Sequence, residues 1–346
     1  MKDKTAIKKS LLLLAVLLAL GVSLAEAAEE KVKEEKFKLG SIEIQARSGS
    51  ACGAPAYIAL EKGFFAEEGL DVTLVAGNFE TQKAGLASGK FYVANGDFNF
   101  FPSIVEGLDL KIVAGLHEGC IKLIVPPDSS IKNAKDLKGK TIGVDQIGGT
   151  PFFVASLVLA EAGLDPTKDV KWRPYPLDQL SVAVGKGEID AYSAWDPFGS
   201  LAVRDQNYQV ISDIATDPLF AGRFCCFLYA SNKKIKEEPE KVEAILRAYN
   251  KAIEWIGANP SEAAKIEIEQ GYVKTSDQAL LTQLLSEYKY HGTQHLHGTG
   301  QPSDPKADAY YFASRLQKAG FFQGKNLDVE KWVDDVYYDV LGTTKK

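Results

Sequence analysis

A glycine pair between an apolar strand and a long apolar helix is the first feature that could do chemistry. The letters TIGV predict the end of a buried strand, and Gly148 and Gly149 follow, with Thr150 and Pro151 opening the helix. A helix N-terminus offers unpaired backbone N–H groups to an anion. No lysine follows Gly149 and the glycine spacing is wrong, so the phosphate-loop and dinucleotide patterns are absent. The turn is predicted either to hold a small anionic or polar ligand or only to reverse the chain.

Two short segments combine histidine and cysteine. His117 and Cys120 lie in HEGC, and Cys225 and Cys226 lie in FCCF. A buried histidine near thiols could bind a soft metal, or the thiols could form a disulfide. We prefer the interpretation that these small apolar side chains simply pack, and we expect no bound metal.

The remaining histidines gather in HGTQHLHGTG, which contains His291, His295 and His297. The two histidines of the H-x-H pair could chelate a metal on an extended loop. A solvated, glycine-rich loop is the alternative, and the sequence does not decide its role.

The elements that must position these residues alternate between strands and helices over the first two thirds of the chain. Such alternation predicts parallel βαβ units, with each sheet covered on both faces. After residue 231 the pattern becomes almost wholly helical. These helices need a sheet to pack on, so we expect them to return to the first lobe. The sequence thus predicts lobe 1 from residues 37–126 and 231–346, and lobe 2 from residues 127–230.

The N-terminus reads as an export signal. Lysines at positions 2, 4, 8 and 9 precede the apolar run 11–20, and Ala25-Glu26-Ala27 offers a small-x-small cleavage pattern. We predict a signal peptide over residues 1–27, a charged tether over 28–36, and a protein that is soluble in the periplasm or outside the cytoplasm. The net charge of −6 makes nucleic acid a poor partner.

Several segments together resemble the sulfonate/nitrate/taurine class of bacterial solute-binding proteins, a class related to the thiamine-pyrimidine synthases. The resemblance covers roughly residues 38–255. It rests on AYIALEKGFFAEEGLDVTLV, KAGLASGKFYVANGD, IKNAKDLKGKTIGVDQIGGTPFFVASLVLAEAGLDPTKDVKW and VAVGKGEIDAYSAWDPF.

This resemblance implies a two-lobed α/β periplasmic-binding-protein fold of type II, with mostly parallel sheets joined by two crossover strands. A hinge is expected at residues 125–129 and 224–231. The implied function is capture of a small anionic or zwitterionic ligand (sulfonate, taurine, nitrate, bicarbonate or similar) for an ABC permease in the membrane. We expect a monomer without enzymatic activity or cofactor. The alternative is a thiol- or metal-dependent relative of the pyrimidine synthases.

Candidate ligand residues follow from loops at the carboxyl ends of strands and from the family likeness. Trp195 could form an aromatic wall, Arg223 could pair with an anionic group, and Asp196 either meets a cationic group or caps the next helix. The full predicted set is Ser50, Cys52, Gly53, Phe79, Thr81, His117, Gly148, Gly149, Thr150, Trp195, Asp196 and Arg223.

Overall fold

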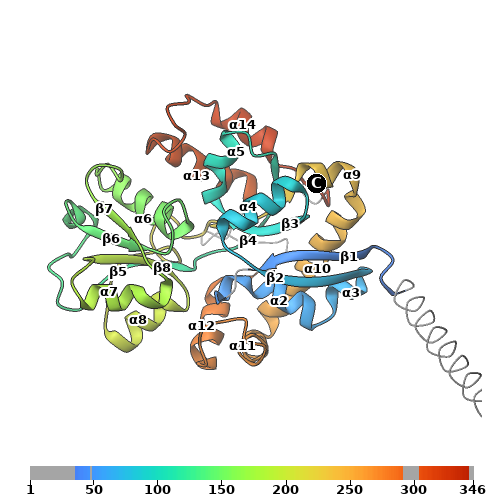
Figure 1. Ribbon diagram of the computed structural model, residues 1–346, viewed down its shortest axis with the longest axis horizontal. Helices are drawn as coiled ribbons and strands as arrows, with labels where there is room; N and C mark the ends of the chain where they lie inside the picture. Colours follow the sequence, from blue (N-terminus) through green and yellow to red (C-terminus); the bar gives the residue numbers. More distant parts are fainter. Residues whose placement is uncertain (1–35, 47–48, 291–303, 343–346) are drawn as a thin grey trace, which may run out of the picture.

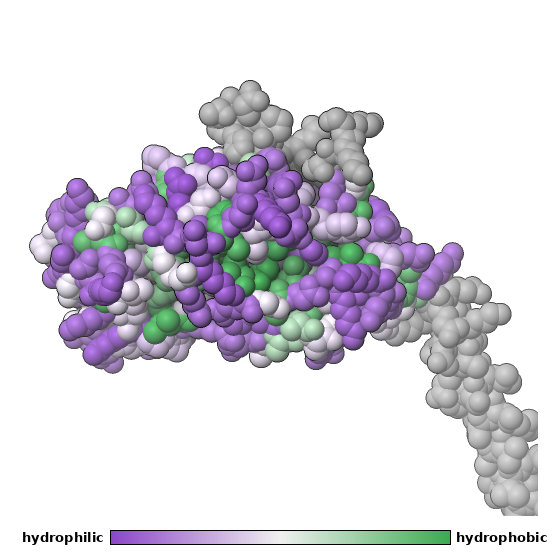
Figure 2. Space-filling model, turned by 90° about the horizontal axis from the view of Figure 1, so that it is seen from above, coloured by the Kyte–Doolittle hydropathy of each residue, from purple (hydrophilic) through white to green (hydrophobic). Residues whose placement is uncertain are grey.

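The computed structural model describes residues 36–46, 49–290 and 304–342, and Figure 1 shows two α/β lobes side by side. The predicted signal peptide, most of the tether and the histidine-rich segment lie outside the described residues. Among the residues that are described, no helix combines the length and apolar character that crossing a membrane requires. Seen from the side of helices α13 and α14, the surface is mostly hydrophilic, and hydrophobic residues show through toward its middle (Figure 2).

The first lobe begins with two parallel strands. Strand β1 (Gly40–Ala46) pairs in register with β2 (Leu70–Ala76). Ile42, Ile44 and Ala46 are buried on one face of β1, and Gln45 is buried on the other face near the end of the strand. The connection contains η1 (Ala51–Gly53), α2 (Ala54–Glu61) and α3 (Phe64–Glu67), and β2 leads into α4 (Phe79–Ser88).

A second sheet of the first lobe has three antiparallel strands in the order β3-β10-β4. Their bounds are β3 (Val93–Asp97), β10 (Cys226–Ser231) and β4 (Leu110–His117), and η2 (Phe98–Phe100) and α5 (Phe101–Val105) connect β3 to β4. The central strand β10 is buried along its whole length, which matches its continuous apolar sequence.

The second lobe contains one five-stranded sheet in the order β7-β6-β8-β5-β9. The strands are β5 (Ile121–Val125), β6 (Thr141–Val144), β7 (Lys171–Pro174), β8 (Ala191–Trp195) and β9 (Gln209–Asp213). The helical segments are η3 (Ala134–Leu137), α6 (Thr150–Glu161), η4 (Leu177–Gln179), α7 (Leu180–Gly185) and α8 (Phe198–Gln206).

The two-lobed α/β fold is confirmed, but the sheets are mixed rather than mostly parallel. The reason is that β5 and β10, which follow the two passages between lobes, each run antiparallel to both neighbours.

The pairing of these two strands also moves the expected lobe boundaries. Residues 121–125 were expected in lobe 1, yet β5 pairs with β8 and β9; residues 226–230 were expected in lobe 2, yet β10 pairs with β3 and β4. The polar, proline-containing stretch after Val125 is a loop of the second lobe and does not join the lobes. We therefore propose that the chain passes between lobes at residues 118–120 and 214–225, and that any hinge lies there.

The C-terminal helices pack against elements of the first lobe. They are α9 (Asn232–Glu237), α10 (Pro239–Ala258), α11 (Pro260–Glu269), α12 (Gln278–Glu287), α13 (Pro305–Lys318) and α14 (Val329–Val336). The longest, α10, is amphipathic and buries Val242, Ile245, Tyr249, Ile253 and Ile256 at helical spacing against α2 and α3. Helix α14 contacts β4.

Candidate functional site

A cleft of about 170 Å³ lies between the two lobes. The first lobe contributes Gln45, Gly77, Asn78, Phe79, Gln82 and Asn99, and the second contributes Asp145, Gln146, Gly149, Thr150, Leu177 and Trp195. Most of these residues lie at or just beyond the carboxyl ends of β1, β2, β6, β7 and β8. Ligands of open α/β sheets bind at such strand ends, so this cleft is the candidate ligand site.

Two helices begin at the cleft, and they are capped differently. In α4 the Asn78 side chain accepts a hydrogen bond from the Thr81 backbone N–H at 3.0 Å. In α6 the N-cap is Gly149, which has no side chain to bond the first turn, and Pro151 follows Thr150. The start of α6 therefore presents its positive dipole end to the cleft without a capping side chain.

Four of the predicted ligand residues come together in this cleft. Phe79 and Trp195 supply aromatic surface from opposite lobes, and Gly149 and Thr150 supply the start of α6. Gly148, beside them, has a φ of +80°, a left-handed conformation that glycine adopts readily, so it shapes the turn.

The polar groups predicted to grip a ligand at this turn already have partners within the protein. The Gly149 backbone N–H donates to the Gln146 carbonyl at 3.1 Å. The Thr150 hydroxyl donates to the Asp97 carboxylate of the other lobe. In this structure both predicted donors therefore have partners within the protein, because one closes the turn and the other joins the lobes.

Thr81 does not line the cleft. Its hydroxyl accepts from the Asn78 backbone N–H at 2.9 Å, which completes a capping box, and it lies 3.2 Å from Gln45 Oε1, to which it donates. The Gln45 amide in turn donates to the Asn78 carbonyl at 2.9 Å. Thr81 therefore positions Gln45, which does line the cleft.

The loop containing Ser50, Cys52 and Gly53 is buried and lies apart from the described lining of the cleft. The Ser50 hydroxyl lies 2.7 Å from the Cys52 sulfur and caps η1. The Cys52 carbonyl accepts from the Asn95 amide at 2.8 Å. These contacts give the loop a packing role, in contrast to the predicted ligand role.

Asp196 and Arg223 also have internal partners. The buried Asp196 carboxylate pairs with Lys122 at 3.1 Å and caps α8 through the Ser200 N–H and hydroxyl. Arg223 pairs with the buried Asp308 at 3.2 Å, and its guanidinium lies 3.7 Å from the centre of the Tyr311 ring. Neither belongs to the described cleft lining, and each charge is neutralised within the protein.

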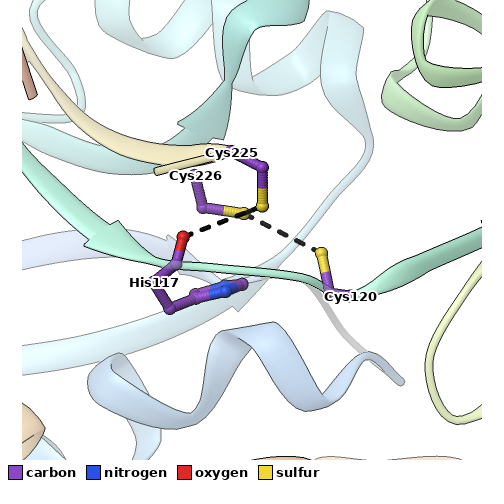
Figure 3. Close-up of side chains that lie close together, drawn as sticks. All are labelled: His117, Cys120, Cys225 and Cys226. Carbon is purple, nitrogen blue, oxygen red and sulfur yellow. Dashed lines mark hydrogen bonds between the residues drawn. The ribbon is translucent and has the colours of Figure 1, made fainter. Parts of the chain in front are cut away.

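His117 lies beside the cysteines at the first passage between lobes, outside the described cleft lining (Figure 3). Its ring stacks on Tyr288 at 5.0 Å, and its Nδ1 lies 2.9 Å from the Glu118 carbonyl. All four cysteines are buried. Burial raises the pKa of the Cys225 and Cys226 thiols, so both stay protonated at neutral pH.

Sequence reasoning missed most of the polar lining. Asp145 and Gln146 directly follow the apolar strand β6, a signal that could have identified them. Gln82 lies inside a helix and Asn99 lies in an aromatic run, where no local pattern marks them. The missed lining residues are Gln45, Gly77, Asn78, Gln82, Asn99, Asp145, Gln146 and Leu177.

The chemistry of the lining is that of neutral amides and aromatic rings. Side-chain amides come from Gln45, Asn78, Gln82, Asn99 and Gln146. Among the described lining residues, Asp145 is the one charged side chain, and none is lysine or arginine. Such a site can hydrogen-bond a small polar molecule and attract a cationic group more readily than it can neutralise a bare anion.

Known binding proteins resemble this chain. The "Putative aliphatic sulfonates-binding protein" of Bacillus subtilis (strain 168) is 27% identical over 224 residues, which cover 62% of this chain and 65% of that protein. The nitrate/nitrite binding protein NrtA of Nostoc sp. (strain PCC 7120 / SAG 25.82 / UTEX 2576) is 24% identical over 300 residues, covering 79% of this chain and 61% of that protein. The chain thus spans less than two thirds of the length of these relatives.

A solved structure shares the fold. The alkanesulfonate-binding protein SsuA from Xanthomonas axonopodis pv. citri, bound to MOPS, superposes with a TM-score of 0.67 and 17% sequence identity, covering 86% of this chain and 98% of SsuA. A family model described as NMT1/THI5 like matches residues 52–263, well over half of the chain. The chain therefore belongs to the NMT1/THI5-like family.

Proposed function

We propose that the protein is the solute-binding component of an ABC importer, exported by its N-terminal signal and acting as a monomer outside the cytoplasm. The observation that carries this proposal is the cleft whose walls come from both lobes at the ends of parallel strands. Such a site can close around a ligand and release it when the lobes part. The relatives named for binding sulfonates or nitrate support a binding role without catalysis. The partners are a membrane permease and a small molecule, with neither nucleic acid nor cofactor.

The ligand class follows from the charges at the cleft. Asp145 supplies a negative charge, and the start of α6, capped by Gly149, supplies the positive end of a helix dipole. These two features suit a small zwitterion, with its ammonium group toward Asp145 and its anionic group toward α6. Among the ligands expected from sequence, taurine has both groups, whereas nitrate and bicarbonate have only the anionic one. A cleft of about 170 Å³ fits a small metabolite better than a drug-sized ligand, which needs about 300–1,000 Å³.

Isothermal titration with taurine, methanesulfonate, nitrate and bicarbonate tests this proposal. Taurine is expected to bind most tightly, and Asp145→Asn is expected to remove its advantage over methanesulfonate. Asp165→Asn, which changes an exposed carboxylate of the same lobe, is the control and should bind as the unaltered protein does. Tighter binding of nitrate than of taurine would refute the zwitterion assignment, and binding of none of the four would refute this ligand range.

A further inference from the structure

Four potential metal ligands meet where the chain passes between the lobes. His117 and Cys120 flank the first passage, and Cys225 and Cys226 end the second. Their ligand atoms all lie within 4.8 Å of one another, and all four residues are buried. Figure 3 shows the three sulfur atoms facing one another between the two segments, with the His117 ring on the other side of its own segment in this view. Two parts of the chain about a hundred residues apart thus supply one donor set.

Two of the sulfur–sulfur distances match those of a tetrahedral zinc site. The Cys120 and Cys226 sulfurs are 3.9 Å apart, and the Cys225 and Cys226 sulfurs are 3.6 Å apart. Two sulfurs bound to one zinc ion at about 2.3 Å, with a tetrahedral angle between them, are about 3.8 Å apart. The Cys226 sulfur is thus already spaced for zinc from the other two sulfurs, and the most distant ligand atoms, which are within 4.8 Å of each other, would need to move closer.

The hydrogen bonding of His117 is a second, independent observation that points to a metal ligand. Its Nδ1 lies 2.9 Å from the Glu118 carbonyl, and this contact places the proton on Nδ1. Nε2 is then left with its lone pair, and it is buried with no hydrogen-bond partner. Metal-bound histidines have this arrangement, because a carbonyl that accepts from one ring nitrogen orients the other toward the metal.

We propose that His117, Cys120, Cys225 and Cys226 bind one zinc ion. Binding converts three thiols into thiolates and releases three protons. Asp97 can take the proton of Cys226, because the Cys226 sulfur donates to its Oδ1 at 2.7 Å, and the other two protons pass to water. One zinc ion, three thiolates and a neutral imidazole carry a net charge of −1, which the protonation of Asp97 offsets.

A zinc ion with four protein ligands has no open position, so this site is structural and does not perform catalysis. It would tie the two passages to each other at the proposed hinge. The proposal is independent of the ligand in the cleft, since none of the four residues lines the described cleft.

Metal analysis and cobalt substitution test the site. The full chain, purified with a reductant and stripped by a chelator, is dialysed against Zn²⁺, and bound zinc is measured by mass spectrometry. One zinc ion per chain is expected, and Co²⁺ in its place should give sulfur-to-cobalt charge-transfer absorption. Cys120→Ser and His117→Gln should weaken zinc binding by more than the 10–100-fold typical of losing an outer-shell partner. Asp165→Asn, which changes a carboxylate of the second lobe outside the set, should retain full zinc binding.

Three outcomes overturn the proposal. The first is that the reduced protein binds no stoichiometric zinc. The second is that Cys120→Ser binds zinc as tightly as the unaltered protein does. The third is that the exported protein contains a disulfide between Cys120 and Cys226 that persists without zinc. Because Cys226 also bonds Asp97, a Cys226 variant could fail to fold. Cys120→Ser is therefore the deciding variant, and circular dichroism checks that it folds.

Discussion

The Thr150 hydroxyl at the start of α6 donates a hydrogen bond to the Asp97 carboxylate at the end of β3. This contact joins the two lobes at the edge of the cleft that Thr150 lines. The same carboxylate accepts from the Cys226 sulfur at 2.7 Å. One buried acidic residue therefore connects the cleft wall to the passage between lobes.

Thr150→Val removes the donor of this contact and is expected to favour lobe opening. A hydrogen bond to a charged group contributes about 1.5–3 kcal/mol, so ligand affinity should fall roughly 10- to 100-fold. Isothermal titration measures the affinity, and small-angle scattering should show a larger radius of gyration without ligand. Thr167→Val, which removes an exposed hydroxyl of the same lobe, is the control. Unchanged affinity together with an unchanged radius in Thr150→Val would contradict the role of this contact.

Trp195→Ala should weaken ligand binding more than it weakens the fold. The ring is half-buried at the end of β8 and lines the cleft, so its loss removes contact surface for the ligand. We expect at least about a tenfold loss of affinity, which corresponds to about 1.4 kcal/mol.

Trp172→Ala provides the opposite pattern as a control. Trp172 packs on Phe152 at 4.6 Å between ring centres, away from the described cleft lining. This variant should lower the melting temperature and keep the ligand affinity. Thermal unfolding and titration of both variants separate the two effects. If Trp195→Ala lowers the melting temperature but keeps the ligand affinity, Trp195 does not belong to the binding site.

Lys122→Met should destabilise the second lobe. Lys122 is largely buried and bridges Asp196 at 3.1 Å and Asp213 at 3.3 Å. Removal of one partner from a buried ion pair costs about 3–5 kcal/mol, because the remaining charge stays buried. At roughly 2–4 °C per kcal/mol, the melting temperature should fall by about 6–20 °C. Lys168→Met, which breaks a surface pair with Asp165, is the control and should melt like the unaltered protein. If Lys122→Met also melts like the unaltered protein, the stabilising role of Lys122 is contradicted.

The buried carboxyl group of Glu267 is expected to make the stability of the fold depend on pH. Burial raises the pKa of its carboxyl group, and neither of its oxygens has a hydrogen-bond partner within the described structure. Below the unfolded-state pKa of about 4.3, both states hold the proton and the stability is complete. As the pH rises above this value, the unfolded state ionises first, so the free energy of unfolding decreases.

Glu267→Gln should therefore be more stable than the unaltered protein at pH 8 and nearly equal to it at pH 4. Denaturant unfolding at both pH values measures this difference. Glu269→Gln on the same helix is the control, since Glu269 is exposed beside Lys265. If Glu267→Gln is no more stable than the unaltered protein at pH 8, the ionised Glu267 carboxylate does not destabilise the fold and the prediction is contradicted.

The fold was predictable because alternating strands and helices leave a strong local pattern. The lobe boundary expected near Val125 was wrong because a polar, proline-containing stretch has the same sequence character whether it connects two lobes or forms a loop inside one lobe. Only the pairing of β5 with β8 and β9 places it in the second lobe. Pairing between distant strands has no local signal in a single sequence.

The site was predictable where function follows directly from position at a strand end. Trp195 and Gly149 are such cases, and both line the cleft. The capping role expected for Asp196 is present in the structure. The ion-pair partners of Asp196 and Arg223, which are Lys122 and Asp308, could not be foreseen because they lie 74 and 85 residues away in the chain. A charged residue that is neutralised over such a distance looks the same in sequence as one that is available to a ligand.

The most direct test of the central claim is a crystal structure with the ligand that binds most tightly in the titrations. The account predicts density for that ligand between Trp195 and Asn78, with a contact to Asp145 and to the start of α6. Ligand density elsewhere, for example beside Cys52 and away from these residues, would contradict the assignment of this cleft as the binding site.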